Sequence, residues 1–468
     1  MPKLLSKPPF LGYTHRRDEI SFNGDGQVLG GTFAALVERL TLHDTAVDPT
    51  YRDAFLMTFR EFSSPQKLLQ ALKDRFLMEP PKVDTSTGQV LTADQQRLWN
   101  DKKLEPVRLM VINTFKTWLE AYWLDADNVC VEDMKEFIES KVFDKYDGVR
   151  HLLLRFIKQK NGHLGASAAS RILLPVLYDT PPPPLAPPKL TDFGLLDLDP
   201  LEVARQITII EMHTFCAIKP SEMLHQNWMR VGAEDRSMNV RSFVQFSNRM
   251  SQWVVRSVLD PVDARIRARY LKFFIKLGTR LLELSNYNGV MAVRAGLNAA
   301  PVTRMKVTWD LLGAKNKSAF ERIERATDST KNFAEYRTTL RSLVPPALPF
   351  LGIALSDLTF AYEGNPDFRG PKDNLINFDK YHRVADIING LRRFQRPFNL
   401  RPVPEIAAWI EARFAEGAEV PAPNFNNVMY EVSLEREPRS QPVATVREAG
   451  MMRASASFGS ISKLFDKA

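Results

Sequence analysis

The stretch that decides the fold is Leu348-Pro349-Phe350-Leu351-Gly352-Ile353-Ala354-Leu355-Ser356-Asp357-Leu358-Thr359-Phe360-Ala361-Tyr362-Glu363-Gly364-Asn365-Pro366. An apolar stretch of helical length begins just after Pro349 and stops at Glu-Gly-Asn-Pro, because glycine and proline both end helices. A second helical stretch is predicted over residues 376–394. Together they predict a helical hairpin whose first arm ends in one acidic residue, Glu363, beside a glycine turn.

Helical periodicity extends outward from this hairpin through most of the chain. One apolar series has spacings of four, three, four and four, which is one face of an amphipathic helix: Ile266, Tyr270, Phe273, Leu277 and Leu281. Polar residues such as Arg267 fall largely between these positions. Strand signals are few, because alternating Val and Thr bounded by turns are scarce. The pattern predicts an all-α fold with two helical domains, the C-terminal one carrying the protruding hairpin.

Composition describes an ordinary globular protein. Its 468 residues predict two or three domains, and 44% apolar with 25% charged residues is enough for real cores. The net charge of +8 is read as a mildly basic, solvated surface, with attraction to an acidic partner or an anionic membrane as the alternative. No basic stripe is interleaved with aromatics, so nucleic-acid binding is not expected.

Proline marks the domain boundary. The cluster at residues 181–188 excludes a continuous helix and predicts a stiff linker, with a loose SH3-ligand pattern at Pro184-x-x-Pro187-x-Lys189 as the alternative. After Pro438 the chain is rich in Ser, Arg and Ala and is expected to be loosely attached. There is no signal-peptide core and no apolar run of membrane-spanning length, so a cytoplasmic protein is predicted.

The sequence offers little for covalent or metal chemistry. It has no phosphate-binding G-x-x-x-x-G-K-[ST] loop, no G-x-G-x-x-G after a strand, no H-E-x-x-H and no G-x-S-x-G elbow. Cys130 and Cys216 are far apart and lack partners at ligand spacing, so neither zinc nor a disulfide is expected. Single histidines such as His213 and His225 are read as core or surface residues. No metal or cofactor is predicted.

The back part of the chain resembles the catalytic domain of Ras-family guanine-nucleotide exchange factors, of the son-of-sevenless and fungal Ras-activator type. Four blocks in order carry the resemblance, and the hairpin is the fourth. The first is Leu198-Asp199-Pro200-Leu201-Glu202 followed by Ile218-Lys219-Pro220-Ser221-Glu222, the second is Asn248-Arg249-Met250-Ser251-Gln252-Trp253, and the third is Ser285-Asn286-Tyr287-Asn288-Gly289 followed by Pro301-Val302-Thr303-Arg304-Met305. Ala354, Gly278 and Ser285 depart from the family's usual residues, which bears on partner choice more than on activity.

The front part resembles the Ras exchanger motif that accompanies this catalytic domain. The blocks that carry the match include Gly30-Gly31-Thr32, Leu36-Val37-Glu38-Arg39-Leu40-Thr41, Asp48-Pro49-Thr50-Tyr51-Arg52-Asp53-Ala54-Phe55-Leu56 and Ser64-Pro65, and the helix with Val107 and Trp118 continues it. The resemblance implies an exchanger-motif domain over residues 20–160, a Pro-rich linker over 161–192, a catalytic domain over 193–440 and a flexible tail over 441–468. In the family the front module packs against the catalytic domain and braces the hairpin.

The resemblance implies exchange by physical displacement. The hairpin would pry open the first switch segment of a Ras-type GTPase, and the Glu363 carboxylate would compete for the serine and lysine that hold phosphate and Mg²⁺. Thr359, one turn earlier, would hinder the Mg²⁺ site. Gly364 would permit the tight turn, and Asn365 would cap it.

A second surface is implied for the partner's other switch segment. It consists of Trp228, Val244, Gln245, Asn248, Phe333 and Phe350. Aromatic members could instead be core residues. Four further residues are expected to support the hairpin without touching the GTPase: Asn286, Asn288, Arg304 and Trp309.

Two other classes of protein remain open. One is a scaffold with the exchanger fold that binds a GTPase without opening it, and the other is an enzyme acting on a small molecule in a helical pocket. The resemblance implies a Ras-family GTPase as partner, in its nucleotide-free or GDP form. It also implies recruitment through that GTPase to the inner face of the plasma membrane. Two questions stay open: whether a second, GTP-loaded GTPase site lies between the modules, and whether the chain is part of a longer activator.

Overall fold

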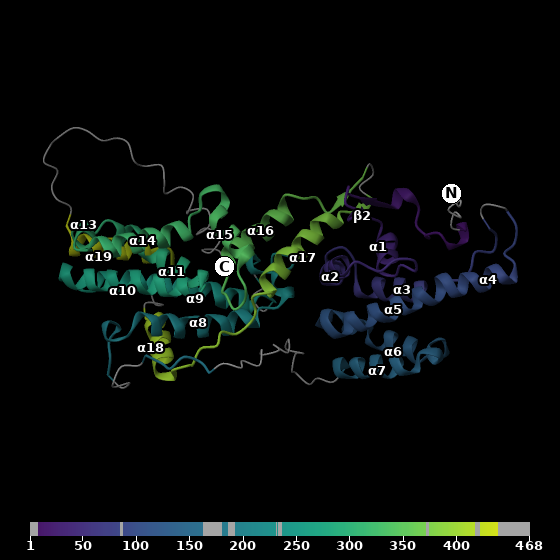
Figure 1. Cartoon of the computed structure of the whole chain (residues 1–468), viewed down its shortest axis with the longest axis horizontal. Coiled ribbons are helices and arrows are strands. Elements are labelled where there is room, and N and C mark those ends of the chain that lie inside the picture. Colours follow the sequence, from purple (N-terminus) through teal and green to yellow (C-terminus); the bar gives the residue numbers. More distant parts are fainter. Residues whose placement is uncertain are drawn as a thin grey trace. The chain divides into compact units, whose positions relative to one another are not determined.

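The computed structural model describes residues 8–84, 88–161, 180–185, 192–230, 232, 236–370, 374–416 and 422–438. Most of the expected linker and the whole expected tail, residues 441–468, lie outside these ranges. Helices dominate the described chain and strands are few and short, which confirms the predicted all-α class (Figure 1). The chain divides into two compact units. Unit 1 comprises Met1–Ala169 and Thr359–Ile387, and unit 2 comprises Ser170–Leu358 and Ile388–Ala468.

Unit 1 is a helical body with a small sheet. Its elements before the linker are β1 (Ile20–Phe22), β2 (Val28–Gly31), α1 (Phe33–Leu40), α2 (Pro49–Thr58), α3 (Pro65–Phe76), α4 (Ala93–Trp99), α5 (Glu105–Thr117), α6 (Val131–Glu139) and α7 (Asp147–Asn161). Local sequence explains where several begin. The Asp48 carboxylate accepts from the Thr50 N–H, and Pro49 opens α2 without losing a helical donor.

The sheet brings a distant part of the sequence into unit 1. Its strand order is β1-β2-β4-β3, where β3 is Phe368–Arg369 and β4 is Leu375–Ile376, and all pairings are antiparallel. Gly31 of β2 pairs with Ile376 of β4. A Cβ atom on Gly30 would lie 2.7 Å from the Ile376 carbonyl oxygen, so this crossing needs glycine.

Aromatic side chains join the same two parts of unit 1. Phe378 opens α17 (Phe378–Arg392) and is fully buried. Its ring centroid lies 4.8 Å from that of Tyr51 and 6.2 Å from that of Phe55, both on α2. The residues after α16 therefore share a core with α2. Buried aromatic rings at this spacing stabilise that core.

Unit 2 is a larger bundle. Its helices are α8 (Pro200–Ala217), α9 (Met238–Leu259), α10 (Ala264–Glu283), α11 (Tyr287–Leu297), α12 (Ala300–Thr303), α13 (Lys306–Asp310), α14 (Ala314–Ala326), α15 (Thr330–Ser342), α18 (Pro404–Ala415) and α19 (Ala422–Arg436). Helix α16 (Leu351–Glu363) begins in this unit, and its last residues belong to unit 1. Residues from α8, α9, α10 and α11 form the main apolar core.

The buried face of α10 differs from the one expected. Ile266 is exposed, whereas Arg267, placed on the polar side by its sequence spacing, is 1% exposed. The Arg267 guanidinium donates to Thr308 Oγ1 at 3.0 Å and to the Pro261 carbonyl at 3.1 Å, and it forms an ion pair with Glu437. Satisfied donors allow a charged side chain to be buried, which a hydropathy pattern does not register.

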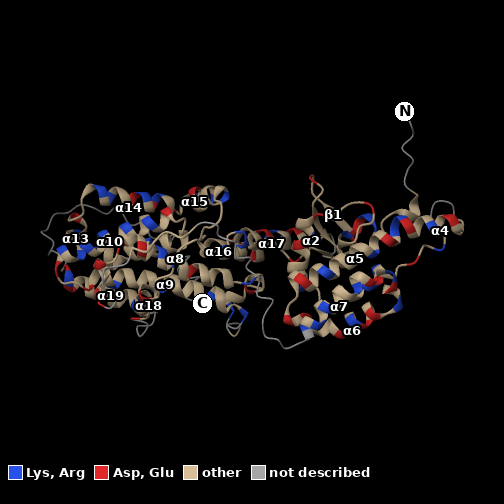
Figure 2. Cartoon of the chain, turned by 60° about the horizontal axis from the view of Figure 1, so that its bottom comes forward, with Lys and Arg blue, Asp and Glu red and all other residues tan. Residues whose placement is uncertain are grey.

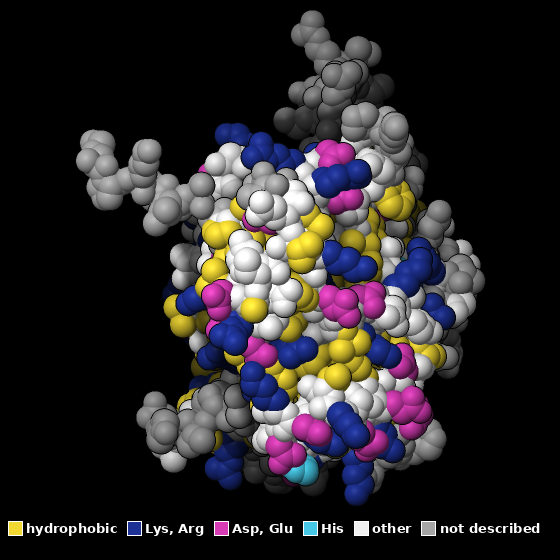
Figure 3. All heavy atoms as spheres, turned by 90° about the vertical axis from the view of Figure 1, so that its right-hand side faces the viewer, with side chains coloured by type: hydrophobic (Ala, Val, Ile, Leu, Met, Phe, Trp, Pro, Cys, Tyr) yellow, Lys and Arg dark blue, Asp and Glu magenta, His cyan; other side chains and the backbone are white. Residues whose placement is uncertain are grey.

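Charge is mixed over the described surface. Basic and acidic residues are interspersed along helices such as α14 (Figure 2). The face drawn in Figure 3 carries apolar, basic and acidic groups side by side. Within the described ranges, none of the helices combines the length and the apolar content that crossing a bilayer requires.

Candidate functional site

The C-terminal end of α16 carries an exposed carboxylate. Glu363 is the last residue of the helix, and its side chain is exposed. The helix dipole disfavours a negative charge at this end by about 0.3–1 kcal/mol. A residue that opposes its local environment is expected at functional sites more than elsewhere.

Two further side chains lie within one turn of Glu363. Thr359 is half-buried, while Phe360 is 71% exposed. The buried positions of this helix are Leu351, Gly352, Ile353, Leu355, Leu358 and Ala361. Phe360 follows buried Ile353 by seven residues, so it lies on the same side of the helix as Ile353 and is nevertheless exposed. It was missing from the predicted site, although an exposed aromatic residue one turn before Glu363 is the signal that could have found it.

The connector after α16 is tightly turned. The Gly364 N–H donates to the Phe360 carbonyl at 2.9 Å, and a Cβ atom on Gly364 would lie 2.8 Å from the same oxygen. Asn365 Nδ2 donates to the Ala361 carbonyl at 3.0 Å. The amide thus satisfies a carbonyl that the end of the helix leaves without a helical partner.

Lys380 fastens α17 to this connector. Its ammonium group donates to the carbonyl oxygens of Tyr362 at 2.8 Å and Asn365 at 3.0 Å, and to Asp367 Oδ1 at 2.7 Å. Asn377 Nδ2 donates to the Pro366 carbonyl at 2.8 Å. We refer to α16, residues 364–377 and α17 as the hairpin, since these bonds join the two helices at its connector.

The N-terminal helices of unit 1 also contact the connector end of the hairpin. The Tyr362 hydroxyl donates to Glu61 Oε1 at 3.0 Å, and the Tyr381 ring lies 4.8 Å from that of Phe62. Arg369 Nη1 donates to the Leu29 carbonyl at 3.0 Å. Side-chain, ring and strand contacts together hold this end of the hairpin within unit 1.

The other end of α16 is supported inside unit 2. Arg337 on α15 makes a bidentate pair with Asp357, at 2.6 and 2.8 Å, and this hydrogen bonding raises the pKa of the guanidinium. The Phe350 N–H donates to the Tyr336 hydroxyl at 2.9 Å. Phe333 is 5% exposed and packs with Tyr336 in a small apolar cluster.

The residues predicted to bind a partner differ in exposure. Gln245 and Asn248 are exposed and lie three residues apart, on one face of α9. Phe350 is half-buried, whereas Trp228 and Val244 are 3% and 7% exposed. Buried Phe333, described above, joins these two, so half of the predicted set is packed in this conformation.

The four predicted supporting residues fall into two groups. Asn286 and Asn288 are buried in unit 2, and both donate to the Glu211 carboxylate on α8. Arg304 instead donates to the Ser433 and Glu437 carbonyls at the C-terminal helix α19. Trp309 Nε1 donates to the Val302 carbonyl, and its ring packs on Phe320. The hydrogen bonds of Arg304 and Trp309 therefore join other parts of unit 2 and do not reach the hairpin.

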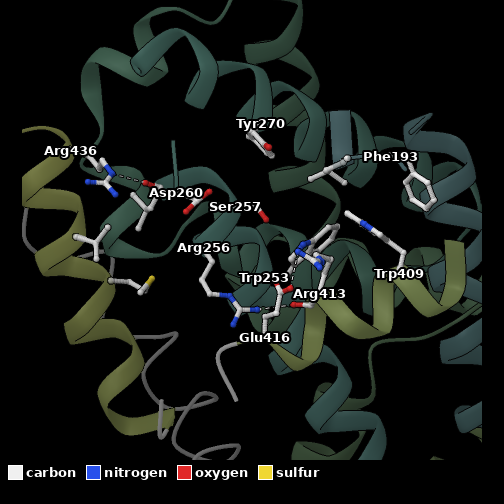
Figure 4. A pocket seen from close by; sticks show the side chains of 15 residues that line it. Phe193, Trp253, Arg256, Ser257, Asp260, Tyr270, Trp409, Arg413, Glu416 and Arg436 are labelled. Carbon is white, nitrogen blue, oxygen red and sulfur yellow. Dashed lines mark hydrogen bonds and ion pairs between the residues drawn. The ribbon is translucent and has the colours of Figure 1, made fainter. Parts of the chain in front are cut away.

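A separate pocket of about 630 Å³ lies in unit 2 among α9, α10, α18 and α19 (Figure 4). Trp253, Tyr270 and Trp409 contribute aromatic walls. Of its arginines, Arg256 donates to the Arg413 carbonyl at 3.0 Å. The described lining contains neither histidine nor cysteine and none of the predicted site residues, so it gives no support to small-molecule catalysis.

The two cysteines do not supply a nucleophile. Cys130 and Cys216 are both free and buried. Burial raises the pKa of each thiol to about 11, so both are protonated at neutral pH. Among the described residues, no group of three or more His, Cys, Asp or Glu is arranged to hold a metal ion.

Comparisons with known proteins identify the two parts of the chain. Residues 202–382 match the RasGEF domain, and residues 27–137 match the RasGEF N-terminal motif. Ras guanine nucleotide exchange factor P of Dictyostelium discoideum is 32% identical over 84% of this chain and 26% of that protein. Cell division control protein 25 of Candida albicans is 29% identical over 91% of this chain and 31% of that protein.

Protein son of sevenless of Drosophila melanogaster is 29% identical over 89% of this chain and 27% of that protein. The chain thus spans between 26% and 31% of the length of these three relatives. Both family matches occur in one chain, in the order N-terminal motif and then RasGEF domain. The chain belongs to the RasGEF family.

Proposed function

We propose that this protein is a guanine-nucleotide exchange factor for a Ras-type small GTPase. The names of its relatives and the RasGEF match support the activity. The observation that carries the proposal is the exposed Glu363 at the end of α16, followed by the Gly364-Asn365 turn. That arrangement offers a negative charge to a partner on a short, well-bonded turn.

The hairpin is the proposed displacing element. Its connector end opens the first switch segment of the GTPase, and the Glu363 carboxylate engages the serine and lysine that otherwise hold phosphate and Mg²⁺. Thr359 occupies space beside the ion. Nucleotide and Mg²⁺ belong to the partner, so the exchange factor needs no cofactor of its own. No bond is made or broken, and release of GDP follows from competition for its ligands.

A second contact is proposed for the exposed face of α9. Gln245 and Asn248 supply polar groups there, and half-buried Phe350 adds an aromatic edge. Trp228, Val244 and Phe333 support this surface from the core. Aromatic and polar residues around a packed centre are the usual composition of binding hot spots.

Exchange follows from linkage between the two ligands of the GTPase. A factor that binds the nucleotide-free form more tightly than the loaded form must weaken nucleotide binding by the same ratio. The protein would therefore catalyse exchange in both directions, and an excess of GTP over GDP would set the outcome. We place it in the cytoplasm, at the inner face of the plasma membrane when bound to its GTPase.

The test is the release of a fluorescent GDP analogue from a purified Ras-type GTPase, with Ras and Rap types tried in parallel. Wild-type protein should accelerate release, and Glu363→Ala should reduce the acceleration at least about tenfold, because a charge-assisted contact is lost. Glu139→Ala is the matched control, since Glu139 is also an exposed glutamate at the last residue of a helix.

The scaffold alternative makes a different prediction. A scaffold would bind the loaded and the nucleotide-free GTPase alike and leave the release rate unchanged, in wild type and in Glu363→Ala. Full activity of Glu363→Ala would contradict the proposed role of the connector while leaving exchange itself standing.

A further inference from the structure

A buried carboxylate links the start of α16 to the α9 face. Glu211 on α8 is 1% exposed. Its Oε2 atom accepts from Asn286 Nδ2 at 2.6 Å, and its Oε1 atom accepts from Asn288 Nδ2 at 2.9 Å. Both oxygens of one side chain therefore hold the same short segment, which we call the 285–288 turn.

The hydrogen-bond directions around Asn286 are fixed by its neighbours. Its Oδ1 atom accepts from the Gly289 N–H at 2.8 Å, so Nδ2 must face Glu211. The second Nδ2 hydrogen reaches Thr208 Oγ1 at 2.9 Å, and that hydroxyl donates to the Ala204 carbonyl at 2.7 Å. Each neighbour of Asn286 already has a fixed role as hydrogen-bond donor or acceptor. Glu211 must therefore accept the remaining Nδ2 hydrogen bond.

Asn288 extends the network to α9. Its Nδ2 atom donates to Ser247 Oγ at 2.7 Å, and Ser247 donates to the Phe243 carbonyl at 3.2 Å. Ser247 lies between Gln245 and Asn248, the exposed residues proposed to bind the GTPase. The same carboxylate thus holds a side chain that fixes this part of α9.

The 285–288 turn in turn holds the segment that enters α16. The Tyr287 N–H donates to the Leu348 carbonyl at 2.8 Å, and the Leu348 N–H donates to the Ser285 carbonyl at 3.0 Å. The Tyr287 ring packs on that of Tyr336, whose hydroxyl accepts from the Phe350 N–H. Main-chain and side-chain hydrogen bonds therefore join the 285–288 turn to the residues that immediately precede Leu351, the first residue of α16.

We propose that Glu211 is a positioning residue for exchange, which acts as a carboxylate to hold the start of α16 in register with the α9 face. The proposal rests on the function proposed above. Glu211 touches neither nucleotide nor GTPase and acts through Asn286 and Asn288. As a buried anion with two amide donors it is poorly suited to stabilise the fold, since burial of charge opposes folding.

The charge state of Glu211 supports this role. Burial raises its pKa to about 7, while the hydrogen bonds from Asn286 and Asn288 lower it. Among the described residues, no charged side chain of α8, α9 or the turn contributes to this pKa. Protonation would put a hydrogen on an oxygen that already faces an N–H donor. Asn288 would then have to rotate, because Asn286 is held by Gly289.

The experiment compares the full chain with Glu211→Gln, which imitates the protonated state at nearly constant volume. Glu202→Gln is the control: Glu202 is also on α8 and fully buried, but it is bonded to Gln206, the Leu185 N–H and Arg205 instead of the turn. At pH 8 the maximal exchange rate of Glu211→Gln should fall about tenfold, the expected loss of one charged hydrogen bond. The half-saturating GTPase concentration should change less.

Three readouts separate positioning from general support of the fold. Between pH 8 and 6, wild type should approach the Glu211→Gln rate, after both are normalised to the intrinsic nucleotide release of the GTPase at each pH. At pH 8, Glu211→Gln should melt no lower than wild type although it exchanges more slowly. Amide hydrogen exchange in a peptide covering residues 345–355 should be faster in Glu211→Gln and unchanged in Glu202→Gln.

Wild-type activity of Glu211→Gln at pH 8, or unchanged amide exchange over residues 345–355, would overturn the inference. Failure of wild type to release nucleotide from any Ras-type GTPase would instead overturn the proposed function. Amide exchange would still decide whether Glu211 holds this segment, since that readout needs no GTPase.

Discussion

The ammonium group of Lys380 donates to the Tyr362 carbonyl oxygen at 2.8 Å, so a cation on α17 satisfies the last turn of α16. Lys380 is only 5% exposed. A lysine buried to this degree needs partners, and it finds them in two carbonyl oxygens and the Asp367 carboxylate. These three bonds fix the conformation of the hairpin connector in the absence of a partner.

Replacement of Lys380 should damage both stability and exchange. Lys380→Met keeps the apolar stem but leaves buried carbonyls without a donor, and it should lower the free energy of unfolding by about 2 kcal/mol. The maximal exchange rate should fall as well, because the end of α16 loses its support. Denaturant unfolding and nucleotide release measure the two effects. An unchanged midpoint would mean that water replaces the ammonium group at no cost.

The absence of a side chain at Gly364 should matter. Gly364→Ala would place a methyl group 2.8 Å from the Phe360 carbonyl oxygen, so the last turn of α16 must open and the exchange rate should fall. Gly390→Ala is the control, since Gly390 lies in the last turn of α17 and a Cβ atom there meets nothing within 4 Å. That control should be neutral or stabilising by about 0.5–1 kcal/mol. Equal activity of the two variants would contradict the need for glycine at the turn.

The exposed aromatic ring of Phe360 should contribute to binding. Phe360→Ser removes an apolar surface that is 71% exposed, so stability should change by less than about 0.5 kcal/mol. Affinity for nucleotide-free GTPase should weaken about tenfold or more if the ring is covered in the complex. Leu109→Ser, at 52% exposure on α5, is the control. Titration by calorimetry gives the affinities, and equal values for the two variants would remove Phe360 from the site.

Sequence patterns found the local features of the hairpin. The end of α16 at Glu363 follows from the Glu-Gly-Asn-Pro signal, because glycine and proline act on the chain within a few residues. The second helix was expected over residues 376–394, and it begins at Phe378. Leu375 and Ile376 instead pair in the sheet with β2. A strand of two residues is too short to show the alternation of apolar and polar residues, and its partner β2 lies more than 300 residues away in the sequence.

Burial was harder to predict than helix position. Arg267 was placed on a polar face but is buried among acceptors that come from distant elements. Trp228 and Val244 are of residue types suited to an interface, but both are packed in the core. Glu211 was not singled out at all, since one acid among 55 acidic residues carries no signal without its two asparagine partners. Each of these depends on tertiary contacts that no local pattern encodes.

Glu211 should also give stability a characteristic pH dependence. Its pKa rises from 4.5 to about 7 on folding, so between these values the folded chain holds a proton that the unfolded chain has released. The stabilisation is complete below pH 4.5 and is lost as pH rises through about 7, with a slope of at most about 1.4 kcal/mol per pH unit. Other carboxylates act in a lower window, because Glu38, Glu105 and Glu437 have pKa values lowered from the usual one.

Denaturant unfolding of wild type and Glu211→Gln, from pH 5 to 8, isolates this contribution because all other groups cancel in the difference. Wild type should lose stability relative to the variant as pH rises, and the variant should be the more stable of the two at pH 8. A difference that stays constant with pH would mean that Glu211 keeps an ordinary pKa. The chain would then hold a carboxylate at this position without opposing its own folding, and stability alone would be enough to explain the residue.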